Sequence, residues 1–206
     1  KILDFFVMNW DHNAPHSVKK YVTEIGQAKS IDQDCDTYLF CGLPLTSSRV
    51  IGVLGDSTWI PAGQPVVHEP VTLKMLAKNE LSSNIRRFNF SVTGPSHMHV
   101  AISARAGAKL INTNLVPELP KPVMWNNRAT YIILYTWGIE STPLFVSLDF
   151  EVPQDWNGPT FDIALSGKCM HERTNLKTPQ YVKFLNSFPN WTDVVPYLAT
   201  YESWVY

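Results

Sequence analysis

The feature that most constrains this chain is a series of segments in which apolar and polar residues alternate. The clearest is LFVSLDFEV at 144–152, where every second residue from Leu144 is apolar, while Ser147, Asp149 and Glu151 fall on the other side. Successive side chains of a strand point to opposite faces, so this pattern predicts a strand with one face buried and one face toward water.

Similar segments recur along the chain and are separated by Gly, Pro and Asn, which is typical of an antiparallel all-β domain. So many strands in one chain predict a β-sandwich or a jelly-roll-like domain. The segment ATYIILYTW is apolar on both faces, so we expect it to be central and buried on both sides. The predicted strands are 2–10, 49–55, 71–77, 86–93, 97–104, 108–115, 129–137, 144–152, 160–167 and 198–206.

One short helix is predicted near the end of the sequence, at about 178–188. Thr178 suits an N-cap, Pro179 suits the first helical position, and Pro189 stops the helix. Apolar residues recur at helical spacing from Tyr181 to Phe188. We therefore expect this helix to pack on the sandwich.

Size and composition favour a single domain over 1–206, with an N-terminal strand and a loose loop region within 1–34. The chain has 206 residues, of which 45% are hydrophobic, enough to build a core. The net charge is −1 with scattered Lys and Arg, so nucleic acid is not expected as a partner. No apolar run is long enough to span a bilayer, and the sequence opens without a targeting signal.

The cysteines and the glycosylation sequons indicate the cellular compartment of the chain. Cys35 and Cys41 can form a disulfide if the chain turns between them, which leaves Cys169 over; the alternative is three reduced, partly buried thiols. Asn89-Phe90-Ser91 and Asn190-Trp191-Thr192 fit the acceptor pattern for N-glycosylation. Together these features favour a secretory-pathway lumen or the extracellular space.

Motifs that would indicate an enzyme fail one by one. His171 and Glu172 begin like a helical zinc site, but Asn175 stands where the second histidine is needed. His12 and His16 have Pro15 between them, which favours a loop. No phosphate-binding glycine motif is present. We therefore expect no catalytic residue and no cofactor in this chain.

The stretch TGPSHMHV, residues 93–100, offers the remaining candidate site. On a strand over 97–104, His97 and His99 share one face while Met98 points to the core. Two imidazoles side by side can bind a metal only with further ligands from elsewhere, so the alternatives are a metal site and a polar outer strand face. The same alternation on the preceding strand places Asn89 outward, as glycosylation requires.

Four stretches in the same order resemble the C-terminal luminal domain of the endoplasmic reticulum metallopeptidase (Felix-ina) family. They are CDTYLFCGLP (35–44), FSVTGPSHMHVAISARAGAKL (90–110), YIILYTWGIESTPLFVSLDFEV (131–152) and FPNWTDVVPYLATYESWVY (188–206). The resemblance covers most of residues 35 to 206. Residues 13–34 are shorter than the family pattern leads one to expect.

The resemblance implies a non-catalytic accessory domain of a membrane-bound zinc metallopeptidase, located in the endoplasmic reticulum lumen. The zinc ligands of the family belong to another domain, and no residue here matches them. The partners implied are the peptidase and transmembrane parts of the parent protein, and another luminal protein is also considered. The role would be partner or substrate contact, or domain stabilisation.

Two other classes of function stay open on the residues alone. One is a free-standing secreted binding module for a glycan or a protein, in which exposed tryptophans such as Trp125 or Trp156 would stack on sugars. The other is a metal-dependent enzyme that uses His97 and His99.

Overall fold

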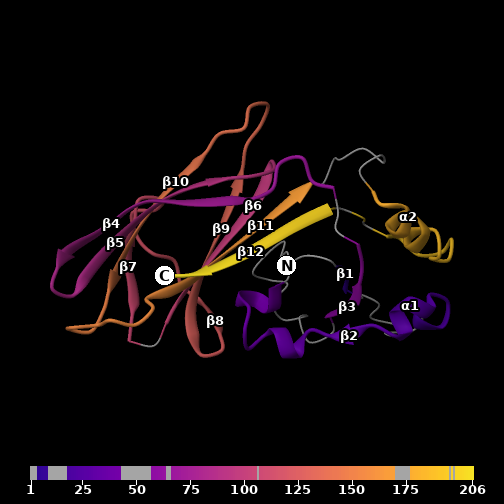
Figure 1. Cartoon of the computed structure of the whole chain (residues 1–206), viewed down its shortest axis with the longest axis horizontal. Helices are drawn as coiled ribbons and strands as arrows, with labels where there is room; N and C mark the ends of the chain where they lie inside the picture. The colour runs from indigo at the N-terminus through magenta and orange to yellow at the C-terminus, as the bar shows by residue number, and fades with distance from the viewer. Residues whose placement is uncertain are drawn as a thin grey trace.

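The computed structural model describes residues 4–8, 18–42, 57–63, 66–105, 107–169, 177–194, 196 and 198–206. Two antiparallel sheets form a sandwich, and a small third sheet lies at one end (Figure 1). The prediction of an all-β sandwich is confirmed. The four-stranded sheet has the order β4 (Thr72–Ser82), β5 (Ile85–Thr93), β10 (Leu144–Glu151), β7 (Lys109–Thr113). The five-stranded sheet has the order β12 (Leu198–Val205), β11 (Phe161–Cys169), β6 (His97–Ala104), β9 (Arg128–Thr136), β8 (Val123–Trp125). The small sheet has the order β1 (Asp4–Met8), β3 (Ser57–Pro61), β2 (Lys29–Ser30).

Aromatic rings fill the space between the two large sheets. Phe88 of β5, Phe150 of β10 and Phe161 of β11 have no solvent exposure. The rings of Phe150 and Phe161 stack with centroids 4.5 Å apart, and Phe88 meets Phe161 edge to face at 5.0 Å. Burying each such side chain contributes roughly 1.5–3 kcal/mol, so this cluster holds the sheets together.

The strand that is buried at every position is β11, whereas the sequence predicted this for the strand at 129–137. The expectation for 129–137 was burial on both faces, but in β9 Leu134 is 61% exposed and Thr136 is also exposed. β11 is covered on its inner face by the other large sheet and on its outer face partly by the segment 31–41. Its neighbour β12 completes the sheet edge.

Asp149 also departs from the prediction, which had it pointing to water from the outer face of β10. It is 5% exposed, because the guanidinium of Arg87 donates from Nε and Nη2 to its two carboxylate oxygens at 2.7 Å. Asn112 donates to the same carboxylate at 3.1 Å. The hydrogen bond from Arg87 is the main reason that the pKa of Asp149 is lowered from its ordinary value.

The predicted helix is present as α2 (Pro179–Leu185). Thr178 caps it as expected, since its Oγ1 accepts a hydrogen bond from the backbone N–H of Tyr181 at 3.2 Å. Phe184 packs on Val22 and Ile25, next to α1 (Thr23–Gly26) in the N-terminal region (Figure 1). The helix therefore packs mainly on the N-terminal segment, and Tyr181 contacts the end of the five-stranded sheet.

The described part of the loose N-terminal region has regular turns. It contains the short helical turns η1 (Val18–Lys20) and η2 (Asp32–Asp34) besides α1 and β2, and the irregular turn η3 (Leu39–Gly42) follows it. The strand predicted at 49–55, the His12–His16 pair and the 171–175 motif lie outside the described residues. No helix in the part of the chain that the structure describes is long and apolar enough to cross a membrane.

Candidate functional site

The turn before β6 interlocks with the neighbouring strand. A Cβ atom on Gly167 of β11 would lie 2.6 Å from Cγ of Pro95 and 2.6 Å from Cγ1 of Val71, so only a glycine lets the Pro95 ring approach this closely. Trp137 donates from Nε1 to the carbonyl of Gly94 at 3.1 Å and from its backbone N–H to the carbonyl of Ser96 at 3.2 Å. This part of the TGPSHM motif therefore serves packing and chain reversal.

The two histidines lie on the outer face of the five-stranded sheet, as predicted, and Met98 between them is 1% exposed in the core. His97 is paired with Lys168 of β11, and His99 is paired with Ser166. His97 Nδ1 lies 2.9 Å from the hydroxyl of Ser96.

The structure adds Lys168, which the sequence analysis did not select, to this pair. Its Nζ atom lies 3.4 Å from Nδ1 of His99, and the lysine is only 2% exposed. When the lysine is charged it can only donate, and Nδ1 of His99 is then the acceptor. The sequence signal that could have indicated this residue is a lysine inside the mainly apolar segment FDIALSGKC.

Burial controls the ionisation of this cluster. Desolvation, with smaller contributions from Lys168 and His97, lowers the pKa of His99 from 6.5 to about 4. Burial lowers the pKa of Lys168 to about 7. A neutral imidazole beside an amine near its pKa can exchange protons, but the amine is out of reach of a solute from solvent. Within the described ranges, no three His, Cys, Asp or Glu side chains are grouped so that they could hold a metal ion.

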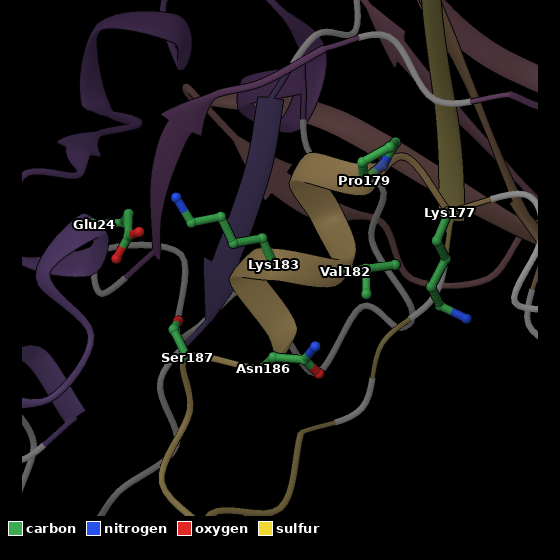
Figure 2. Close-up of a pocket in the computed structure, with 7 residues that line it drawn as sticks. All are labelled: Glu24, Lys177, Pro179, Val182, Lys183, Asn186 and Ser187. Carbon is green, nitrogen blue, oxygen red and sulfur yellow. The ribbon is translucent and has the colours of Figure 1, made fainter.

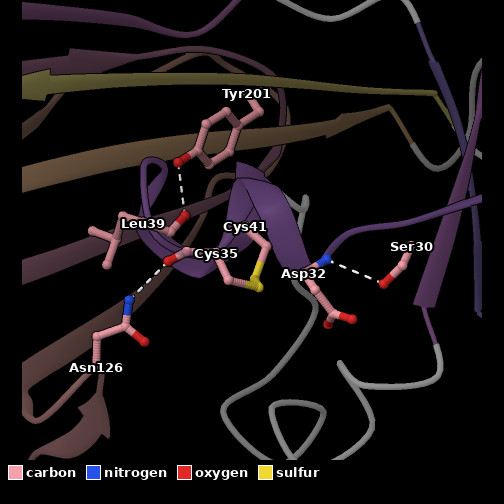
Figure 3. The surroundings of a disulfide bond; sticks show 7 residues. All are labelled: Ser30, Asp32, Cys35, Leu39, Cys41, Asn126 and Tyr201. Atoms are coloured by element: carbon pink, nitrogen blue, oxygen red, sulfur yellow. Dashed lines mark hydrogen bonds between the residues drawn. A yellow bond between two sulfur atoms is a disulfide. The ribbon is translucent and has the colours of Figure 1, made fainter.

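A disulfide loop covers the same outer face further along the sheet (Figure 3). Cys35 and Cys41 are bonded, as proposed from their spacing, and the loop between them ends in η3. The hydroxyl of Tyr201 donates to the carbonyl of Leu39 at 2.7 Å, and Asn126 donates from Nδ2 to the carbonyl of Cys35 at 2.8 Å. Burial raises the pKa of Tyr201. The loop is thus fixed to β12 and to the turn after β8.

Of the tryptophans proposed to stack on sugars, Trp125 is buried and Trp156 is half-buried. Trp125 is 7% exposed, lies edge to face with Phe40 at 6.4 Å, and has the Arg128 guanidinium 5.2 Å from its ring centre. Trp156 is partly buried against the core, and a Cβ on Gly158 would come within 2.8 Å of its ring. Their environment is that of packing residues.

Next to Trp125, a buried carboxylate joins two arginines, another feature that sequence reasoning missed. Asp162 accepts two hydrogen bonds from Arg105, at 3.0 and 2.8 Å, and a further one from Arg128. Arg128 also donates to the backbone carbonyls of Ser103 and Ala104 at 2.9 Å. The carboxylate is thus shared by two guanidinium groups, and the network links β6, β9 and β11.

An open groove runs between α1 and α2 (Figure 2). In Figure 2 the side chain of Lys183 extends from α2 toward Glu24 of α1, whereas Val182 is drawn on the other side of α2. Val182 is 39% exposed there. The hydroxyl of Ser187 in this lining donates to the backbone carbonyl of Phe184 at 2.6 Å. The lining residues are Glu24, Lys177, Pro179, Val182, Lys183, Asn186 and Ser187.

The remaining predicted residues are dispersed. His68 is exposed, and Cys169 is buried beside Leu198 at the end of the five-stranded sheet. Asn89 lies on the outer face of β5, and Asn190 is exposed after α2. The structure brings together His97, His99 and Lys168, and it separates them from both sequon asparagines.

The fold and this site define an antiparallel β-sandwich domain with a disulfide loop fixed over one sheet. Residues 3–204 match the family model described as "Endoplasmic reticulum metallopeptidase 1, C-terminal domain", and the chain belongs to this family. It is 20% identical over 202 residues to the human protein named endoplasmic reticulum metallopeptidase 1. The match takes in 98% of this chain and 22% of the human protein, so the chain spans about a fifth of that relative.

Proposed function

We propose that this chain is a non-catalytic, luminal accessory domain of a membrane-bound zinc metallopeptidase of the endoplasmic reticulum. The family match over residues 3–204 supports the parent, since the relative is a metallopeptidase by name and is about five times as long as the segment matched. The peptidase and membrane parts of the parent are the proposed partners, and another luminal protein is a further proposed partner.

One observation carries the proposal: residues of the motif that marks the family are used for packing. A Cβ on Gly167 would clash with Pro95 and Val71 at 2.6 Å, and a Cβ on Gly94 would crowd Val71 at 3.1 Å. His99 is desolvated and neutral beside the buried Lys168. This arrangement stabilises a rigid scaffold, and a scaffold suits domain stabilisation or the positioning of a partner.

The test uses the full-length parent protein with the double substitution His97→Ala and His99→Ala. Peptide hydrolysis and zinc content should equal those of the wild type, provided that the domain keeps its thermal transition. Deletion of residues 1–206 should instead lower the amount of folded parent in the membrane. Hydrolysis by the isolated domain, or loss of hydrolysis in a folded double variant, would overturn the non-catalytic role. Protease protection of this segment in sealed microsomes tests its luminal placement.

The binding-module alternative receives little support from these tryptophans, because Trp125 is buried and Trp156 is half-buried against the core. The third class, a metal-dependent enzyme using His97 and His99, is tested by the same double variant.

A further inference from the structure

The outer face of the four-stranded sheet presents a complete glycosylation sequon. Phe88 and Phe90 of β5 are buried between the sheets at 0% and 1% exposure. Asn89 and Ser91 therefore point to the opposite, outer side. The acceptor amide and the hydroxyl of the sequon thus lie on one face of one strand.

The strands on either side of Asn89 carry small side chains opposite it. Its partner on β4 is Ala77 and its partner on β10 is Ser147, both small side chains. Directly opposed Cβ atoms in an antiparallel pair are about 4.5–5.5 Å apart, so larger neighbours would crowd the amide. Asn89 itself is half-buried, and its two flanking side chains are short.

The amide of Asn89 is also chemically available. Other asparagines near this face are used: Asn112 donates to Asp149 at 3.1 Å, and Asn114 donates to the carbonyl of Phe145 at 3.0 Å. Asn114 also accepts from the backbone N–H of Ser147 at 2.7 Å. Within the described ranges the side chain of Asn89 makes no such hydrogen bond. The fold therefore does not need this amide.

An exposed aromatic ring lies next to the sequon. Phe145 of β10 is paired with Ser91 and is 58% exposed, on a face that is otherwise mainly polar. It is the diagonal neighbour of Asn89, and aromatic side chains reach diagonal partners across a sheet. The C–H face of a pyranose ring is apolar and packs on aromatic rings much as other apolar groups do. A sugar attached to Asn89 would cover the surface that Phe145 exposes.

We propose that Asn89 carries an N-linked glycan whose first N-acetylglucosamine packs on Phe145. In the reaction, Nδ2 of Asn89 forms a bond to C1 of the sugar of a lipid diphosphate-linked oligosaccharide. The bond from C1 to the diphosphate oxygen breaks, Nδ2 loses a proton, and the lipid diphosphate leaves. The inference rests on the luminal placement proposed above, because this transfer takes place in the lumen.

Occupancy is tested on the chain of 206 residues placed behind a cleavable signal sequence in a secretory host, so that the lumen is reached whatever the topology of the parent. Asn89→Gln and Ser91→Ala should each remove one glycan by mass, while Asn190→Gln serves as the matched control and leaves the Asn89 glycan in place. An unmodified Asn89 in the secreted wild type overturns the inference. Failure of the luminal proposal would appear separately, as digestion of this segment of the parent in sealed microsomes.

Packing on Phe145 is tested by comparing three forms: the full high-mannose glycan, a single N-acetylglucosamine left by endoglycosidase H, and Asn89→Gln. The single sugar should preserve a gain of about 2–4 °C in Tm over Asn89→Gln. Phe145→Ser should abolish this difference, whereas the control Leu134→Ser, at a 61% exposed position of the other sheet, should not. Equal Tm values for the single-sugar form and Asn89→Gln, or a gain that survives in Phe145→Ser, would refute the packing.

Discussion

Replacing Gly167 with alanine probes the contact on which the motif TGPSHM depends. The added Cβ would lie 2.6 Å from Pro95 Cγ, 2.7 Å from Pro95 Cδ and 2.6 Å from Val71 Cγ1, against ordinary contacts of 3.4–4 Å. The proline ring cannot rotate away, so the strand or the turn must shift. Such overpacking costs about 1–3 kcal/mol, and the lower entropy of the unfolded alanine chain offsets about 0.4–1 kcal/mol of it.

The net expectation is a loss of about 1–2 kcal/mol in the free energy of unfolding, which for a domain of this size lowers Tm by about 2–8 °C. The free energy of unfolding is measured by urea denaturation, with tryptophan fluorescence as the signal. Gly138→Ala is the matched control, because no atom lies within 4 Å of the new Cβ, so only the entropy effect acts and the free energy of unfolding should rise by about 0.4–1 kcal/mol instead of falling.

A second substitution at the contact tests the cause. Pro95→Ala in the Gly167→Ala background should recover part of the loss, with a coupling of about 0.5–3 kcal/mol in the double-mutant cycle. An unchanged denaturation midpoint for Gly167→Ala, or simple additivity of the two substitutions, would refute the interpretation of the motif as a packing device.

Three further predictions concern the outer face of the five-stranded sheet. Tyr201→Phe leaves the carbonyl of Leu39 without its donor and should lower the free energy of unfolding by about 1–2 kcal/mol, as measured by chemical denaturation. An unchanged denaturation midpoint would contradict the role of this hydroxyl. Replacing Cys35 and Cys41 with serine should cost about 2–3 kcal/mol and abolish the sensitivity of Tm to dithiothreitol. His99 has its pKa lowered from 6.5 to about 4, so the unfolded chain binds its proton first, and stability should fall as pH drops through this window. Allowing for screening at this partly exposed site, the free energy of unfolding should fall by about 1–2 kcal/mol between pH 6.5 and pH 4. Unfolding of the wild type and of His99→Gln at these two pH values measures the effect, and the variant should not show it. Equal losses in both proteins would exclude His99 as the cause.

The strand pattern could be predicted because alternation is a local property. The strand over 97–104 has the predicted bounds, and the cap of Thr178 on α2 follows from a few neighbouring residues. The period-two pattern also placed Met98 in the core correctly. Local residue types therefore determined most of the sandwich.

What could not be predicted depends on which segments cover each face. Alternation places Lys168 on the outer side of β11, but nothing near it in the sequence shows that this side is buried. Trp125 is covered for the same reason, by Phe40 from a distant segment. Asp149 is buried because Arg87, 62 residues away, pairs with it. These errors all arise from contacts between residues far apart in the sequence.

The hydrogen bond between Tyr201 and Leu39 joins residues 162 positions apart, and this separation sets an order of assembly. During synthesis Leu39 leaves the ribosome long before Tyr201, while the disulfide partners, six residues apart, can meet at once. The loop can therefore be oxidised early and can meet Trp125 and Asn126 once they are made, but its anchor on Tyr201 forms only after β12 has been made and paired with β11. In a nascent or truncated chain that lacks β12, the loop is held less firmly, and the outer surface of β6 and β11 is more accessible to chaperones.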